Sequence, residues 1–311
     1  MKQASVTTLV VLLMSLAAPS TAAIWQVPGD FATIQEAIDS SLVIDGDRIM
    51  VGPGNHAGAY VTKSVEIWGE GGATIDSGPM HPAGLSMGFR FLAGSDGATI
   101  NHLTFEVDLA IMNGAGVSDV TVSHCTFNDT IQAVSNWMGN GWEISHNVIT
   151  DLRTQNGGGI GILIADSTGG YVMDNVVSHN QISGTLHVFE GDGGGYAGSG
   201  IVLYADWRWG ASGSASISFN RVVKNRISMV SDTPAVVDIA AFELTEAQNP
   251  SPEAHVVTDN SIGFNDFRGT ENQITLSPET LDNPVNFIDR NLGDNRGHPL
   301  YHPSVFGPGG N

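Results

Sequence analysis

Short segments in which apolar and polar residues alternate recur at a constant interval in the middle of the chain. Three of them share one phase, with equivalent positions 22 residues apart, at residues 98–105, 120–127 and 143–149. We expect the apolar residue at the centre of each segment to face the interior: Ile100, Val122 and Ile144. Such an interval between short strand-like segments is typical of a chain coiled into a solenoid of parallel strands.

A second set of apolar segments alternates with the first. We interpret it as five successive rungs of one parallel sheet, at residues 109–113, 131–136, 161–166, 200–206 and 237–243. After residue 292 the chain is rich in Pro and Gly, and we expect this tail to pack over the last turn.

One amphipathic segment precedes the strands. Residues 31–41 predict a helix, capped by Asp30 or Thr33, with one apolar face: Ile34, Ala37 and Ile38. The first turn of a solenoid has no neighbour on one side, so we expect this helix to cover the apolar end of the coil.

Pairs of Asn residues five positions apart recur later in the chain, in residues 175–180, 220–225 and 260–265. Asn tolerates the left-handed backbone conformation that a sharp corner between strands requires. Stacked on successive rungs, these side chains could also form an amide ladder, which would explain them without any function.

The first 23 residues have the features of a signal peptide. Lys2 precedes an apolar run that ends in small residues near Ala23. The alternative is an uncleaved anchor. We expect one mature domain, residues 24–311, that is secreted or periplasmic and has no membrane span once the signal is removed. Cys125 is the only cysteine, which excludes an internal disulfide, and we expect its thiol to be buried.

Four motifs near the start of the mature chain resemble those of a known superfamily. They are residues 31–39 (FATIQEAID), 46–54 (GDRIMVGPG), 65–71 (VEIWGEG) and 73–76 (ATID), and they resemble the opening of pectin-lyase-like right-handed parallel β-helix proteins. The resemblance implies an all-β, single-stranded right-handed parallel β-helix of about ten rungs with an N-terminal capping helix. That superfamily includes polysaccharide lyases, hydrolases, esterases, epimerases, adhesins and copper-loading proteins, so the motifs predict the fold rather than an activity.

Charge narrows the choice of partner. The chain has 12 Lys and Arg against 32 Asp and Glu, a formal net charge of −20. This excess of negative charge argues against nucleic acid and anionic membranes as partners. It also disfavours polyanionic sugars unless a cation bridges them. A polysaccharide or cell-surface glycan is the partner that we expect.

Each strand of the second set ends in an amide or a carboxylate, namely Asn113, Asn136, Asp166, Asp206 and Glu243. If these ends form one column, neighbours lie about 4.8 Å apart. Asp166, Asp206 and Glu243 would then have spacings that suit glycoside hydrolysis, or they could bind Ca²⁺. The alternative is that these residues only initiate the turn after each strand.

Aromatic residues accompany these carboxylates. We expect Trp137, Tyr204, Trp207 and Trp209 to stack on sugar rings, or else to pack under long loops. Arg208 could pair with a uronate carboxylate or stack on the tryptophans. The resemblance implies a further role for Arg208, because lyases of that superfamily use Arg or Lys as the base.

Histidines occupy one position of the 22-residue interval. We expect His102, His124 and His146 to stack outward about 4.8 Å apart, with Asp174 at the equivalent position of the next rung. Such a column could share copper or zinc, or it could be a solvated ladder. Residues 190–195 could wrap Ca²⁺ through Asp192, but a plain loop is the default interpretation.

The leading hypothesis is an exported β-helix protein that binds and cleaves a polysaccharide. Cleavage would be hydrolysis by Asp166, Asp206 and Glu243 or a Ca²⁺-assisted elimination. The alternative is a non-catalytic, surface-binding or structural protein of the envelope, and metal handling is third.

Overall fold

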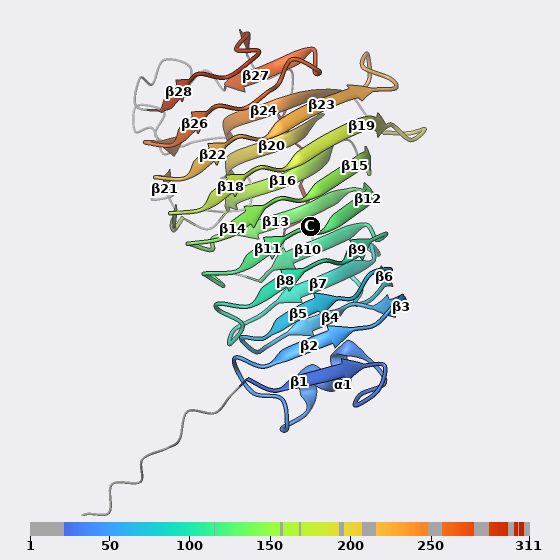
Figure 1. Ribbon diagram of the computed structural model, residues 1–311. Coiled ribbons are helices and arrows are strands. Elements are labelled where there is room, and N and C mark those ends of the chain that lie inside the picture. The colour runs from blue at the N-terminus through green and yellow to red at the C-terminus, as the bar shows by residue number, and fades with distance from the viewer. Residues whose placement is uncertain are drawn as a thin grey trace, which may run out of the picture.

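The computed structural model describes residues 22–114, 116–155, 158–167, 169–192, 196–206, 216–247, 257–276, 286–297, 302–303 and 305–307. Within them every pairing between strands is parallel, and the strands stack into one coil (Figure 1). The coil is a right-handed parallel β-helix. This is the hand that nearly all connections between parallel strands adopt. The predicted fold class is therefore confirmed.

Three long sheets run along the coil. Sheet A contains β1 (Ile24–Val27), β2 (Arg48–Val51), β5 (Glu66–Gly69), β8 (Thr99–Asn101), β11 (Thr121–Ser123), β14 (Glu143–Ser145), β18 (Val176–Ser178), β22 (Arg221–Val223), β26 (Ser261–Gly263) and β28 (Phe287–Asp289). Sheet B contains β3 (Gly54–Ala57), β6 (Ala73–Ser77), β9 (Thr104–Phe105), β12 (Thr126–Thr130), β15 (Val148–Arg153), β19 (Gln181–His187) and β23 (Arg226–Ser231).

Sheet C holds the longest strands. It contains β4 (Ala59–Val61), β7 (Met87–Phe91), β10 (Leu109–Asn113), β13 (Gln132–Trp137), β16 (Gly159–Asp166), β20 (Tyr196–Asp206), β24 (Asp238–Ala247), β27 (Asn272–Leu276), β29 (Arg296–Gly297) and β30 (His302–Pro303). A short sheet D is formed by β17 (Tyr171–Met173), β21 (Ser216–Ser218) and β25 (Val257–Thr258). The five predicted rungs are confirmed, because β10, β13, β16, β20 and β24 are successive neighbours in sheet C.

The interior is built from columns of apolar side chains in register. In sheet A, Ile100 pairs with Val122 and Val122 with Ile144, and all three are fully buried as predicted. β-Branched side chains suit these short strands because they pack well on a pleated surface. Full burial of each stabilises the fold by about 1.5–3 kcal/mol relative to an exposed position.

Sheet C bends where two consecutive residues face the interior. At this bend Gly161 and Gly200 lie against the next rung, where an added Cβ would come within 2.5 Å and 2.7 Å of the carbonyl oxygens of Gly200 and Ala241. Side chains on either side of the bend, such as Ile160 and Leu163, therefore face the outer side of the sheet and belong to a second apolar cluster.

The helix predicted at residues 31–41 is α1 (Ile34–Asp39). Thr33 is its N-cap, and its side chain accepts a hydrogen bond from the backbone N–H of Glu36. Ile34 and Ile38 are fully buried in the main core. The helix packs beside β1 and β2 at the N-terminal end of the coil (Figure 1).

Two amide ladders follow the corners of the coil, as predicted. One runs from Asn136 through residues 175, 220 and 260 to Asn286, with each Nδ2 donating to the next Oδ1 over 2.8–3.0 Å. The other runs from Asn147 through residues 180, 225 and 265 to Asn291 over 2.9–3.0 Å. Because these amides point into the coil, each one satisfies buried polar groups that would otherwise cost about 1–3 kcal/mol.

The left-handed residue at each corner is not the Asn itself but the residue before it. His179, Lys224, Phe264 and Arg290 have φ between 55° and 59°. This left-handed conformation turns the side chain of the residue before each Asn outward and the Asn side chain inward. The expected use of Asn for the left-handed position is therefore wrong, because the buried amide has to reach along the ladder.

The single thiol is buried, as predicted. Cys125 is 1% exposed, its backbone N–H donates to Asn147 Oδ1, and burial raises the pKa of the thiol to about 12. In the part of the chain that the structure describes, no helix is both long and apolar enough to span a bilayer. The predicted signal segment lies outside the described residues, apart from its last two positions.

Candidate functional site

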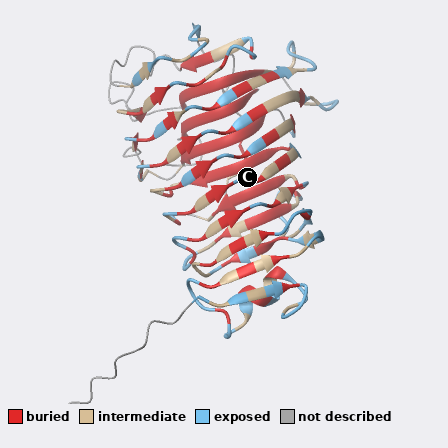
Figure 2. Ribbon diagram, in the orientation of Figure 1, coloured by how far each residue is buried: buried red, intermediate tan, exposed pale blue. Residues whose placement is uncertain are grey.

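The outer face of sheet C is closed, although its side chains point away from the coil. Outward-facing Met87, Leu109, Met112 and Ile160 pack into one apolar cluster with Phe306 of the C-terminal tail. Figure 2 shows the strands of sheet C almost wholly as buried. A parallel sheet buried on both faces has apolar residues on both, which is the composition found here.

The tail lies against this face at several points. β30 pairs with β20, with His302 beside Tyr196. Farther on, the amide of Gln132 accepts a hydrogen bond from the backbone N–H of Phe306 and donates to its carbonyl oxygen, over 3.3 Å for the second contact. His81 Nε2 lies 2.9 Å from the carbonyl oxygen of Gly307. The expectation that the tail packs over the last turn holds for β29, which pairs with β27. It is wrong for residues 302–303 and 305–307, which return along sheet C to β13 and to the segment before β7.

Of the predicted column of strand ends, only Asn113 and Asn136 lie together, with Asn113 Nδ2 donating to Asn136 Oδ1 over 3.4 Å. Asp166 pairs with Ala205, Asp206 with Ala247, and Glu243 with Val202, so the three carboxylates occupy three different columns. The reason is strand length, because β16, β20 and β24 run for 8, 11 and 10 residues and end at different registers. A polar residue near the end of a strand therefore does not occupy a constant register in sheet C.

The three carboxylates also differ in direction. Asp166 shares a column with Ala205 of the main core and faces inward, whereas Asp206 follows outward-facing Tyr204 by two residues and faces outward. Glu243 faces outward but lies four residues away from Asp206 in register, about 13 Å along the strand at about 3.3 Å per residue. The predicted glycosidase pairs are Asp166 with Asp206 and Asp166 with Glu243, and in both pairs the two side chains face opposite sides of the sheet, so they do not flank one sugar.

None of the three carboxylates lies in an open groove. Asp166, Asp206 and Glu243 are 0%, 1% and 1% exposed. Asp166 accepts hydrogen bonds from the backbone N–H groups of Gly169 and Gly170, so it holds the turn after β16 as the alternative interpretation expected. A catalytic role for these residues stays a prediction.

Glu243 is the carboxylate whose environment is most unusual. Burial raises the pKa of its side chain to about 8, and a 2.8 Å hydrogen bond from Ser199 Oγ to Glu243 Oε2 opposes this only in part. Its Oε1, together with the hydroxyls of Thr245 and Thr275, has no hydrogen-bond partner among the described residues. Thr275 pairs with Glu243, so these polar atoms gather on the outer face of β24 and β27.

The predicted sugar platforms are closed or not described. Trp137 and Tyr204 are fully buried in the outer cluster, and a Cβ added at Gly307 of the tail would lie 3.8 Å from the Trp137 ring. Their use in stacking on a sugar stays a prediction that requires the tail to move. Trp207, Arg208 and Trp209 lie outside the described residues.

The histidine column forms as predicted and is longer by one ring. The centroids of His102, His124 and His146 are 5.1 Å apart at each step, and His179 continues the stack at 4.7 Å. Asp174 is not the next member, because Ser145 pairs with Ser178 and so places residue 179 there. The repeated Ser-His-Asn at residues 145–147 and 178–180 was the signal for it.

This corner stack continues at both ends with other side chains. Trp68 packs on His102 at 4.2 Å, and Arg48 lies over Trp68. Burial and neighbouring charges lower the pKa of His124 and of His179. Among the described residues no three His, Cys, Asp or Glu side chains are arranged to hold one metal ion.

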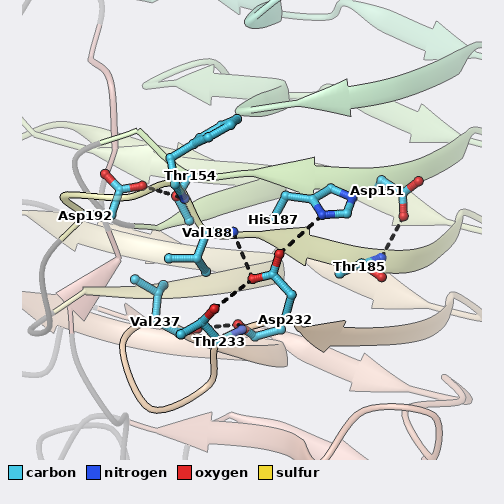
Figure 3. A network of polar contacts seen from close by, with 11 residues as sticks. Asp151, Thr154, Thr185, His187, Val188, Asp192, Asp232, Thr233 and Val237 are labelled. Carbon is cyan, nitrogen blue, oxygen red and sulfur yellow. Dashed lines mark hydrogen bonds and ion pairs between the residues drawn. The ribbon is translucent and has the colours of Figure 1, made fainter.

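The loop proposed for Ca²⁺ is described only as far as residue 192. There Asp192 accepts a hydrogen bond from Thr154 (Figure 3). Nearby, His187 faces Asp232, which also accepts from the backbone N–H of Val188 over 3.0 Å (Figure 3). These contacts hold the ends of β19 and β23 together.

The sequence matches no protein-family model, and no curated protein matches it. Among solved structures, a pectin methylesterase in complex with a hexasaccharide is similar at 13% identity, over 93% of this chain and 94% of that chain, with a TM-score of 0.40. A likeness at this level assigns no activity to this chain.

Proposed function

We propose that this is an exported protein that binds a polysaccharide along the outer face of sheet C. The observation that carries the proposal is the group of buried polar atoms without partners on that face, Glu243 Oε1 and the hydroxyls of Thr245 and Thr275. Native proteins pair almost all buried polar groups, and each unpaired one costs about 1–3 kcal/mol. A ligand rich in hydroxyls would satisfy them.

The rest of the face suits the same ligand. Sugars combine apolar ring faces with hydroxyls, and this surface combines an apolar strip around Trp137 with the polar group at β24 and β27. The glycan would take the place of the tail, which is held on β13 mainly by Gln132 and by the packing of Phe306.

Loosening the tail tests this proposal. Gln132→Ala removes both hydrogen bonds to Phe306, so glycan affinity measured by calorimetry over a panel should rise about tenfold, since each bond is worth about 0.5–1.5 kcal/mol. Gln35→Ala is the matched control, because Gln35 clamps the backbone of Tyr60 in the same way far from the tail. Unchanged or weaker binding by Gln132→Ala would place the site elsewhere.

Cleavage by Glu243 is the second candidate. A carboxyl with a pKa of about 8 keeps its proton at neutral pH, as a general acid must, and could protonate the oxygen of a leaving sugar. Glu243→Gln should then lower the release of new sugar ends at least about 100-fold while binding persists. Glu106→Gln, at an exposed acid, is the control. If the wild-type protein releases no reducing or unsaturated ends from the panel, the protein is a binder only.

Export rests on the N-terminal segment. We propose that residues 1–23 are removed during secretion. Sequencing the N-terminus of protein recovered outside the cytoplasm should then find Ile24 first, and retention of residue 1 would contradict this.

A further inference from the structure

A second concave surface lies on the other side of the coil, on the outer face of sheet A. It spans β18, β22 and β26 and encloses about 320 Å³. Its chemically distinctive lining residues are two cations, a histidine, two hydroxyls and an aromatic ring: Arg221, Lys224, His179, Ser178, Ser261 and Phe264. The volume is at the lower end of the range for small-ligand sites.

The cations of this surface are unusual for so acidic a protein. Arg221 and Lys224 are exposed, and no described carboxylate forms an ion pair with either of them. Other arginines nearby are neutralised, because Arg268 pairs with Asp266 and Arg290 with Asp289. Within the described residues, this surface therefore places two cations without an ion pair side by side on a chain of net charge −20.

The acidic residues on the neighbouring rungs do not neutralise Arg221 and Lys224. Asp174 and Asp259 lie at the far corner of the same sheet, but the corner position of the Arg221 rung between them is held by Phe219. The register that aligns the three rungs thus gives the central one two cations and no acid.

We propose that this surface binds a carboxylated sugar residue of an acidic polysaccharide. The planar fork of Arg221 matches a carboxylate, and Lys224 adds a point charge beside it. The hydroxyls of Ser178 and Ser261 can bond to sugar hydroxyls, and half-exposed Phe264 offers an apolar edge. The overall charge disfavours polyanionic sugars, but the local charge decides the contact within a screening length of about 8 Å.

The surface is independent of the proposed site on sheet C, because it lies on another sheet and no described residue of the tail lines it. Gln132→Ala should therefore leave binding here unchanged. Failure of one proposal leaves the other standing.

The test compares a hexamer of galacturonate with its fully methyl-esterified form. Calorimetry should show that the acid form binds more tightly and weakens as salt is added. Arg221→Gln and Lys224→Gln should each lower its affinity about tenfold and leave the neutral form unaffected. Arg268→Gln is the matched control, since that guanidinium is already paired with Asp266.

Three results would overturn the proposal. One is equal affinity for the two hexamers, and another is an unchanged affinity after Arg221→Gln. The third is equally tight binding of inorganic phosphate or single-stranded DNA, because the surface would then recognise charge rather than a sugar acid.

Discussion

The outer face of sheet C and the corner stack are both columns of outward-facing side chains on one coil, yet the first is closed and the second is open. Trp137 and Glu243 on sheet C are 0% and 1% exposed, whereas His102, His124 and His146 at the corner are exposed. Strand alternation turns the side chains of sheet C outward, and the left-handed corner conformation turns the histidines outward. Around Trp137 the difference is the tail, whose described residues pack on this part of sheet C and not on the corner stack.

The direction of a side chain on the coil does not determine whether it is buried. An outward position on a solenoid becomes core when another segment lies over it, and its polar groups then behave as buried groups do. Burial raises the pKa of Glu243 to about 8, while at the open corner partial burial and the charges of His102 and His146 lower the pKa of His124.

The largest expected effect is on stability. Trp137→Ala should lower the free energy of unfolding by about 3–5 kcal/mol, because it leaves a cavity between β13 and the tail. His124→Asn should change it by no more than about 0.5 kcal/mol, since Asn accepts the left-handed conformation found there. Chemical denaturation followed by circular dichroism measures both. Similar losses in the two variants would remove the distinction between closed and open faces.

The pH dependence of stability gives the next effect. Below about pH 4.3 both states hold the Glu243 proton, and up to about pH 8 only the folded state does. The folded state therefore loses up to about 1.4 kcal/mol per pH unit over this window as the pH rises. Glu243→Gln should remove this loss, so that the variant unfolds at higher denaturant than the wild type at pH 8 but not at pH 4. If the stability of the two proteins changes equally between pH 4 and pH 8, Glu243 is ionised or hydrated in the folded protein.

The repeat and the fold could be predicted because their determinants are local. Ile100, Val122 and Ile144 lie on strands whose pattern is visible within a few residues, and the Asn pairs mark the corners. Ser-His-Asn at residues 178–180 repeats the sequence at residues 145–147 and so marks His179 as a member of the stack. A search at intervals of 22 residues does not find it, because His179 follows His146 by 33 residues.

The candidate site could not be predicted to the same degree because its determinants are not local. The registers of Asp206 and Glu243 depend on how far each strand extends before its loop. The burial of Trp137 depends on a tail whose Phe306 is 174 residues from its partner Gln132. Only the folded coil brings such segments together.

The smallest expected effect is at the corner stack and has the opposite sign with pH. The lowered pKa of His124 and of His179 means that, below about pH 6.5, the unfolded state takes up protons that these rings resist in the folded state. The stability that the stack contributes is therefore lost as the pH falls, whereas that of Glu243 is lost as the pH rises.

His102, His146 and Lys224 are the groups whose charges oppose protonation of His124 and His179. Histidine titration by NMR should show that His146→Asn raises the pKa of His124 and of His179 toward the ordinary value, since the charge of His146 lowers both. Denaturation of this variant should show a shallower loss of stability between pH 7 and 5. If the unfolding free energy of the variant depends on pH as steeply as that of the wild type, solvent screens the rings from one another and their charges do not interact.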